Sequence, residues 1–296
     1  MAKNTVFPKG KLAVVVLTLI GYLPLWLLRV LGKIIGCCSW YANSKARRIT
    51  EINLQYCLPQ LARRSRRALA RQSLLNTVVG GLEMVALWSK PKTWTVEKIV
   101  ETQGLPLLKK CLGEDRGLIL LVPHIGNWEV INVQLPHYCD ILSLYKPHSL
   151  VALNEFILGA RTRIGGELVP TDSTSVKLLL THLKKGKTTC ILPDQVPIDS
   201  NSAISAPFFG HKAKTMTLIY RLIQKTQCNV LFAYCKRVSG GFVTVFKQPD
   251  ETIYSRDKLI SATALNHGIE QCVLDIPEQY QWEYKRFKEE QSFYRR

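Results

Sequence analysis

The pattern of apolar positions divides the chain into three parts. An uncharged apolar stretch runs from Leu12 to Leu28; as a helix it would extend about 26 Å, enough to enter a bilayer. Residues 40–115 follow with mostly helical patterning, and from residue 117 onward short apolar runs alternate with helical stretches. This alternation predicts an α/β domain preceded by a hydrophobic segment.

The α/β part can be divided into individual elements. Helices are predicted at 128–136, 151–164, 175–185, 213–227 and 257–275, and strands at 117–123, 140–146, 167–170, 187–195, 229–238 and 242–248, the last two joined by a turn at Gly240-Gly241. Continuous apolar strands alternating with helices indicate a mixed, largely parallel central sheet covered by helices, with an antiparallel closing hairpin. Functional side chains should then gather at the carboxyl ends of the strands.

The N-terminal segment is best explained as an uncleaved membrane anchor helix over residues 1–36. A cleaved signal peptide would need an A-x-A-like site, which is missing, and the lipidation-like tetrad 34–37 follows an apolar region interrupted by Arg29 and Lys33. More positive charges follow the apolar stretch than precede it, which favours a cytoplasmic main domain. That domain spans 37–296, with 37–115 as a mostly helical lead-in and 116–296 as the α/β core.

The charge balance restricts the partners. The chain of 296 residues carries a net charge of +18, and its 47% of hydrophobic residues excludes a disordered protein. This positive charge predicts an anionic partner. Charge alone does not distinguish nucleic acid, an anionic membrane, a phosphorylated lipid and an acidic carrier protein. Nucleic acid is disfavoured because no reader motif is present. The five arginines within residues 61–72 form either a solvated helix face or a patch on anionic headgroups.

The sequence lacks the motifs of several common kinds of protein chemistry. The nine cysteines include no CxxC, so neither a disulfide framework nor a zinc site is indicated, and buried free thiols in a reducing cytoplasm are expected. G-x-S-x-G and H-E-x-x-H are absent. The triplet 186–188 follows threonine where a phosphate-binding loop needs glycine. The sequence therefore predicts no metal and no cofactor.

One histidine stands where catalysis is expected. The first predicted strand of the α/β core ends at Pro123, and the chain continues with His124, Gly126 two residues later, and Glu129 at the start of a helix. A glycine turn can bring this imidazole and carboxylate within hydrogen-bond reach, which leaves the second ring nitrogen to take a proton from an alcohol. The alternative is a structural histidine, with Glu129 favouring the helix N-terminus.

The order of motifs along the chain resembles a known family. After the apolar segment and the basic helical stretch come VPHIGNWE (122–129), RTRIG (161–165), LPDQ (192–195), PFFG (207–210), and PEQYQW (277–282) with Lys285-Arg286-Phe287. This order is similar to the late acyltransferases of lipid A biosynthesis, within the wider H-x4-D/E acyltransferases. PEQYxW is its most specific part. The family often has a histidine where this chain has Tyr284.

The resemblance implies an acyl transfer without a cofactor. His124, paired with Glu129, would deprotonate a hydroxyl of a lipid A precursor, and the alkoxide would attack the thioester of an acyl carrier protein. Arg161, or backbone amides near Gly126, would stabilise the oxyanion at about 3 kcal/mol per donor. The implied location is the cytoplasmic face of the bacterial inner membrane, where anionic lipids are further partners.

Four further residues are expected to bind substrate. Asn127 would orient the loop or a substrate oxygen, or else cap the helix. Arg163 is the alternative to Arg161. Asp194, at the end of an apolar strand, would pair with a positive neighbour or cap the next loop, and Gln195 follows it. Two other functions stay open: acylation of another membrane glycolipid or aminolipid, and a non-catalytic basic membrane-binding protein.

Overall fold

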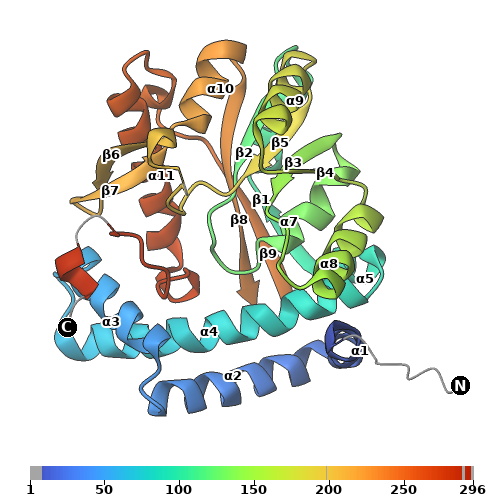
Figure 1. Cartoon of the computed structure of the whole chain (residues 1–296), viewed down its shortest axis with the longest axis vertical. Coiled ribbons are helices and arrows are strands. Elements are labelled where there is room, and N and C mark those ends of the chain that lie inside the picture. The colour runs from blue at the N-terminus through green and yellow to red at the C-terminus, as the bar shows by residue number, and fades with distance from the viewer. Residues whose placement is uncertain (1–8, 198, 289–290, 295–296) are drawn as a thin grey trace, which may run out of the picture.

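A seven-stranded mixed sheet forms the centre of the protein (Figure 1). The computed structural model describes residues 9–197, 199–288 and 291–294. The strand order is β1-β9-β8-β2-β5-β3-β4, and β6 and β7 form a separate hairpin. The bounds are β1 (Ile99–Gln103), β2 (Leu118–Leu121), β3 (Ile141–Tyr145), β4 (Glu167–Pro170), β5 (Thr188–Ile191), β6 (Ala203–Phe208), β7 (His211–Met216), β8 (Asn229–Val238) and β9 (Gly241–Lys247).

Five strands run in one direction. β2, β3, β4, β5 and β8 are mutually parallel, β9 is antiparallel to β8, and β1 is parallel to β9. The carboxyl ends of β2, β5 and β8 therefore meet at one edge of the sheet, as expected of an open α/β fold. This arrangement confirms the mixed, largely parallel sheet and the antiparallel closing hairpin.

Helices cover both faces of the sheet and its carboxyl-terminal edge. Along that edge runs α4, with α2 outside it (Figure 1). The α-helices are α1 (Lys9–Gly21), α2 (Leu25–Tyr41), α3 (Lys45–Cys57), α4 (Arg63–Ser89), α5 (Lys92–Glu97), α6 (Leu105–Gly113), α7 (Glu129–Gln134), α8 (Val151–Ile164), α9 (Ser173–Lys184), α10 (Leu218–Thr226) and α11 (Lys258–Asp275). Short 3₁₀ helices are η1 (Leu135–His137), η2 (Ser200–Ser202), η3 (Glu251–Tyr254), η4 (Pro277–Gln279) and η5 (Gln291–Tyr294).

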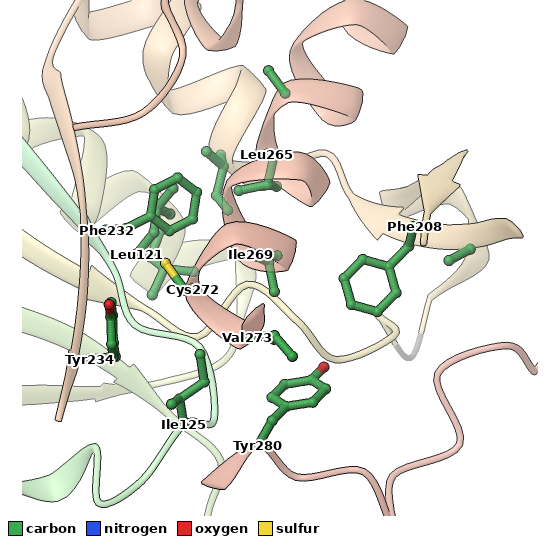
Figure 2. Close-up of a cluster of buried hydrophobic side chains, with 14 of the residues drawn as sticks. Leu121, Ile125, Phe208, Phe232, Tyr234, Leu265, Ile269, Cys272, Val273 and Tyr280 are labelled. Carbon is green, nitrogen blue, oxygen red and sulfur yellow. The ribbon is translucent and has the colours of Figure 1, made fainter. Parts of the chain in front are cut away.

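Side chains of the central strand β2 alternate between two apolar layers. Ile119 and Leu121 belong to the core shared with α9, α10 and α11, whereas Leu118 and Leu120 belong to the core shared with α6 and α7. Figure 2 shows the first layer, in which Leu121 lies near side chains of α11. Because all four residues are at most 1% exposed, β2 is anchored from both sides and fixes the position of the residues that follow it.

The N-terminal segment differs from the single anchor helix predicted over residues 1–36. The structure breaks it into α1 and α2, bent by 119°, because Pro24 stands at the break and lacks the N–H needed to continue a helix. No single described helix is both long and apolar enough to cross a bilayer. The bent pair α1 and α2 has the necessary length and apolar composition only when the two helices are taken together. α2 continues to Tyr41. Residues 1–8 of the predicted anchor lie outside the described part.

Glycines bring α2 close to the body of the protein. A Cβ added at Gly32 or Gly36 would lie 2.7 or 2.8 Å from a Cα atom of α4, so only glycine permits this approach. The opposite surface is apolar and open to solvent, with the exposed residues Leu12, Val15, Val16, Leu19, Tyr22, Trp26, Val30, Ile34 and Ile35. The two helices are therefore two-sided, with one face packed on protein and one unburied apolar face.

One predicted helix begins too early, and the strands β1 and β6 were not predicted. Residues 213–216, predicted as the start of a helix, belong to strand β7, and its partner β6 was not predicted. The residues of β7 alternate in exposure, with Ala213 and Thr215 buried, which matches the period of a half-buried strand. Strand β1 lies within the lead-in predicted as mostly helical. The other predicted strands and helices are present with shifts of a few residues at their ends.

Candidate active site

Asp194 is the carboxylate that holds the imidazole of His124. Its Oδ1 lies 2.8 Å from Nδ1 of the ring, and its Oδ2 accepts the backbone N–H of His124 at 3.0 Å. These residues are 70 positions apart, but they follow β2 and β5, which are adjacent and parallel. The predicted pairing of His124 with Glu129 is therefore corrected: sheet topology supplies the partner, and local spacing does not.

The contacts of Asp194 determine which ring nitrogen of His124 carries the proton. Burial raises the pKa of Asp194, but the charge of His124 and the hydrogen bonds from its ring and backbone outweigh this and hold that pKa below its ordinary value of 3.8. An ionised carboxylate only accepts, so Nδ1 carries the proton and Nε2 is left as the basic atom. The amide nitrogen of Gln195 lies 3.2 Å from Nε2. The His124 side chain is 15% exposed, so substrate can reach it.

Glu129 forms an ion pair with Arg161. The first residue of α7 is Glu129, whose Oε1 accepts from Nε of Arg161 at 3.0 Å and also from Nη2, and its side chain is 1% exposed. The guanidinium lies 5.1 Å from the ring of Trp128, which also contacts His124 at 6.1 Å between ring centroids. The His124–Asp194 pair and the Arg161–Glu129 pair are therefore neighbours, with the indole ring of Trp128 in contact with both.

The loop that carries His124 is fixed by the C-terminal segment and by β8. The backbone N–H of Gly126 donates to the carbonyl of Gln279, that of Asn127 donates to the carbonyl of Cys235, and Ile125 forms an antiparallel bridge with Tyr280. Figure 2 shows the side chains of Ile125 and Tyr280 in the same region. Gly126 has φ 61°, and a Cβ there would lie 1.8 Å from the carbonyl oxygen of Cys235. The N–H groups of Ile125, Gly126 and Asn127 thus already donate to protein carbonyls. These contacts favour Arg161 over the backbone amides near Gly126 as the oxyanion donor.

Asn127 is joined to a buried charge network. It is fully buried, and its Nδ2 donates to Oε2 of Glu83 at 3.4 Å. Glu83 in α4 is also fully buried and forms ion pairs at 2.7 Å with Nε of Arg29 and at 2.8 Å with Nη2 of Arg237. Of the three predicted roles of Asn127, orienting the loop, orienting a substrate oxygen and capping the helix, its burial and this contact favour the first. Trp128 takes the helix-cap position.

Arg163 lies outside the cluster. Its side chain is exposed, and its Nη2 donates to the carbonyl of Trp88 at the end of α4. Two positions separate it from Arg161, which is about 200° around a helix, so the two guanidinium groups point to different sides. Arg161 is the arginine that belongs to the site.

Sequence reasoning missed several supporting residues. Glu83 carried a signal, since a lone acid within the apolar run of α4 is costly unless it is paired. Glu283 lies close enough for its carboxyl to feel the charge of His124; burial raises its pKa, although Thr77, Gln281 and that charge act in the opposite direction. The hydroxyl of Tyr284 accepts the backbone N–H of Val196 at 2.9 Å and so fixes the loop that carries Asp194 and Gln195.

The arrangement suits proton transfer at an oxygen. It provides a partly exposed histidine with one ring nitrogen bound to a carboxylate and the other next to the amide of Gln195, beside an arginine held by a second carboxylate. A positioned base of this kind contributes about 10² to 10⁴ to a rate. Among the residues that the structure describes, no group of three or more His, Cys, Asp or Glu side chains has metal-site geometry.

The matching family model and the relatives found by sequence agree on one family. The model of the bacterial lipid A biosynthesis acyltransferases matches residues 7–289. The lipid A biosynthesis lauroyltransferase of Escherichia coli (strain K12) is 24% identical over 94% of this chain and 90% of its own length. The palmitoleoyltransferase of the same organism is 26% identical over 90% and 86%. A solved structure, the 1-acyl-sn-glycerophosphate acyltransferase PlsC from Thermotoga maritima, covers 85% of this chain and 97% of its own at 12% identity and a TM-score of 0.39.

Proposed function

The chain belongs to the bacterial lipid A biosynthesis acyltransferase family, and on that premise we propose that it transfers a fatty acyl chain from the thioester of an acyl carrier protein to a hydroxyl of a lipid A precursor. Acyl transfer in lipid A biosynthesis is the activity that the relatives share by name. The donor, the acceptor hydroxyl and the residues that act on them are the proposed part. No cofactor is required, because the thioester already provides the leaving group.

His124 acts as the general base in this proposal. Its Nε2 takes the proton of the acceptor hydroxyl while Asp194 stabilises the imidazolium through Nδ1. The alkoxide oxygen attacks the thioester carbonyl, and the tetrahedral intermediate collapses by breaking the carbon–sulfur bond. The leaving thiolate takes the proton back from Nε2, so that the products are an ester and a free thiol. Nε2 ends each cycle unprotonated.

Two polar side chains are placed where they can assist the proposed acyl transfer. Gln195 stands next to Nε2, where the acceptor hydroxyl must enter, and its amide N–H can then donate to the substrate oxygen. Arg161 binds Glu129 through Nε and Nη2, while Nη1 has no hydrogen-bond partner among the described residues. We propose that Glu129 orients Arg161 so that Nη1 faces the developing oxyanion.

The membrane attachment proposed is interfacial. The exposed apolar surface of α1 and α2 can enter one leaflet while the opposite face stays packed on α4. Arg71 of α4 lies 5.9 Å from the ring of Tyr41 at the end of α2. The exposed arginines in the preceding turns of α4, Arg63, Arg64 and Arg67, add attraction to anionic headgroups. We place this surface on the cytoplasmic leaflet of the inner membrane, where an acyl carrier protein has access.

The observation that carries the proposal is the bond between Asp194 and Nδ1 of His124. The test is transfer of labelled acyl chains from acyl carrier protein to a lipid A precursor by the full-length chain, with His124→Ala and the matched control His137→Ala. We expect His124→Ala to lose at least about 10² of the rate and the control to keep it. Equal activity in all three proteins contradicts the proposal. Transfer only to another glycolipid or aminolipid would keep the chemistry and reject the acceptor.

A further inference from the structure

A pocket of about 980 Å³ lies outside the catalytic cluster. It is bounded by α2, the middle of α4, the segment around α5, the β8–β9 turn and η4. Neither His124 nor Asp194 lines it, so the proposed acyl transfer does not account for it. Its volume is at the upper end of the range that holds a small organic ligand or headgroup.

The walls of the pocket are strongly basic. Five basic side chains line it, against one acidic side chain, Glu278; the basic residues are Arg29, Lys33, Lys90, Lys98 and Arg237. The two arginines share the buried carboxylate of Glu83. The three lysines have no carboxylate within ion-pair distance in the described ranges. Positive charge in the pocket is therefore not neutralised by the protein itself.

Two of the lysines, Lys90 and Lys98, are close enough to affect each other. Burial lowers the pKa of Lys90, and the charge of Lys98 lowers it further. The ammonium of Lys90 donates to the carbonyl of Leu23 at 2.8 Å and lies 4.2 Å from the ring centre of Trp94. Bringing two ammonium groups together is unfavourable without an anion. A ligand with two negative charges, such as a phosphate monoester, would relieve this repulsion.

The outer rim of the pocket continues into the apolar surface of the first two helices. Trp26 and Val30 line the pocket and are 66% and 45% exposed. Ile34, one turn beyond Val30 in α2, is 55% exposed. A molecule in the pocket can therefore place a charged group among the lysines and an acyl chain along α2. That combination of charge and apolar contact fits an amphiphile better than a free anion.

We infer that this pocket binds the phosphorylated headgroup of a membrane lipid, with phosphate between Lys90 and Lys98 and with Lys33 at the rim. The inference rests on the proposed function, since it needs α2 at a membrane surface. The inner wall of the pocket includes Arg237 and Gln279, and the Gln279 carbonyl accepts the N–H of Gly126. The bound headgroup thus lies against the residues that hold the His124 loop, where an acceptor lipid is needed.

The test is direct binding, measured without turnover. Titration calorimetry is performed on the full-length chain with short-chain dihexanoyl phosphatidic acid, with dihexanoyl phosphatidylcholine and with inorganic phosphate. The variant is Lys33→Gln/Lys98→Gln, because no hydrogen bond of either side chain to the described residues would be lost. The control is Lys184→Gln/Lys225→Gln, which removes the same charge from α9 and α10 at the opposite end of the molecule (Figure 1).

We expect phosphatidic acid to bind the wild type and the control equally, and the variant about tenfold or more weakly, since each lysine contributes about 1 kcal/mol. Phosphatidylcholine should bind poorly to all three proteins. If phosphatidic acid binding were weakened equally in the variant and the control, the attraction would be a general effect of positive charge, and the assignment of binding to this pocket would be overturned. Binding of inorganic phosphate as tight as that of phosphatidic acid would overturn the lipid assignment. Because His124→Ala should retain the binding, a failure of acyl transfer is distinguishable from a failure of this inference.

Discussion

The carboxylate of Asp194 binds His124 twice, through the ring Nδ1–H and through the backbone N–H. The first contact sets the tautomer, and the second fixes the residue at the end of β2. A side chain from the neighbouring strand end thus determines both the chemistry and the position of the proposed base. Glu129, five residues after His124, instead binds Arg161.

Replacing Asp194 should separate these roles. Asp194→Asn keeps the size of the side chain but removes the charge that stabilises the imidazolium, so kcat should fall by about 10² to 10⁴ with little change in KM. Steady-state kinetics of acyl transfer measure this. Asp172→Asn, which replaces an exposed carboxylate at the start of α9, is the control. If Glu129→Gln lost more kcat than Asp194→Asn, the result would instead support Glu129 as the carboxylate that assists His124.

Glu129 and Arg161 should behave as one unit. Glu129→Gln and Arg161→Gln each disrupt the same ion pair, so the double variant should be little worse than the more severe single variant, with a coupling energy of about 0.5 to 3 kcal/mol in kcat/KM. The matched control cycle uses Arg163→Gln, two residues away and directed at Trp88. That cycle should be additive. Additivity in the first cycle as well would argue against a shared role.

Glu83 should be essential for stability. Glu83→Gln leaves Arg29 and Arg237, whose side chains are 14% and 8% exposed, without their common counter-charge. Breaking a buried pair in this way costs about 3 to 5 kcal/mol, and here one acid serves two arginines. Chemical denaturation of the full-length chain should show the loss, whereas the exposed Glu97→Gln should change stability by less than about 0.5 kcal/mol. Similar unfolding midpoints would contradict the network.

Two glycines allow backbone strain to be separated from collision. Gly126 and Gly210 both have positive φ, 61° and 77°, so alanine at either costs about 1 to 2 kcal/mol. Only at Gly126 would the new Cβ meet another atom, the carbonyl oxygen of Cys235; at Gly210 nothing lies within 4 Å. Gly126→Ala should therefore lose clearly more stability than Gly210→Ala and should also lose activity. Equal losses would mean that the loop can move away without cost.

Glu283 should make stability fall with rising pH. Burial raises its folded pKa above the ordinary value of 4.5, so the folded state holds the proton more tightly than the unfolded state. Its contribution is complete below the unfolded pKa and is lost as the pH rises toward the folded pKa. Glu283→Gln should accordingly be more stable than wild type at neutral pH, with no such gain in acid. The unfolding midpoint in urea, measured against pH, tests this with Glu155→Gln as the exposed control.

The sequence was informative where structure is local. The strands around Leu120 and Leu231 and the helices α8 and α11 follow from hydrophobic period and from turn residues, which act over a few positions. Strand β7 was missed because its lysines weaken the apolar signal. The break between α1 and α2 was harder to foresee, since Pro24 fixes where a helix can bend but packing on α4 decides the angle.

The candidate site shows the same limit. His124, Asp194 and Arg161 were all selected from their motifs, but the pairing between them was wrong for His124. Spacing along the chain favours an acid five residues away, whereas the true partner depends on which strand lies beside β2. The buried carboxylate of Glu83 was missed for the same reason, since its partners come from α2 and β8. Strand order is a property of the whole sheet, and local patterns do not encode it.

The glycines that seat α2 on α4 also govern how far the enzyme can reach. With the two backbones in near contact, the outer helix has no freedom to swing like a tether, so in the proposed membrane attachment the body would stay close to the lipid surface. In the proposed attachment α2 enters the leaflet, so the catalytic loop would stay at a constant height above it, separated by one helix diameter of about 10 Å, that of α4. An acceptor lipid would then be acylated only within that fixed distance of the leaflet surface.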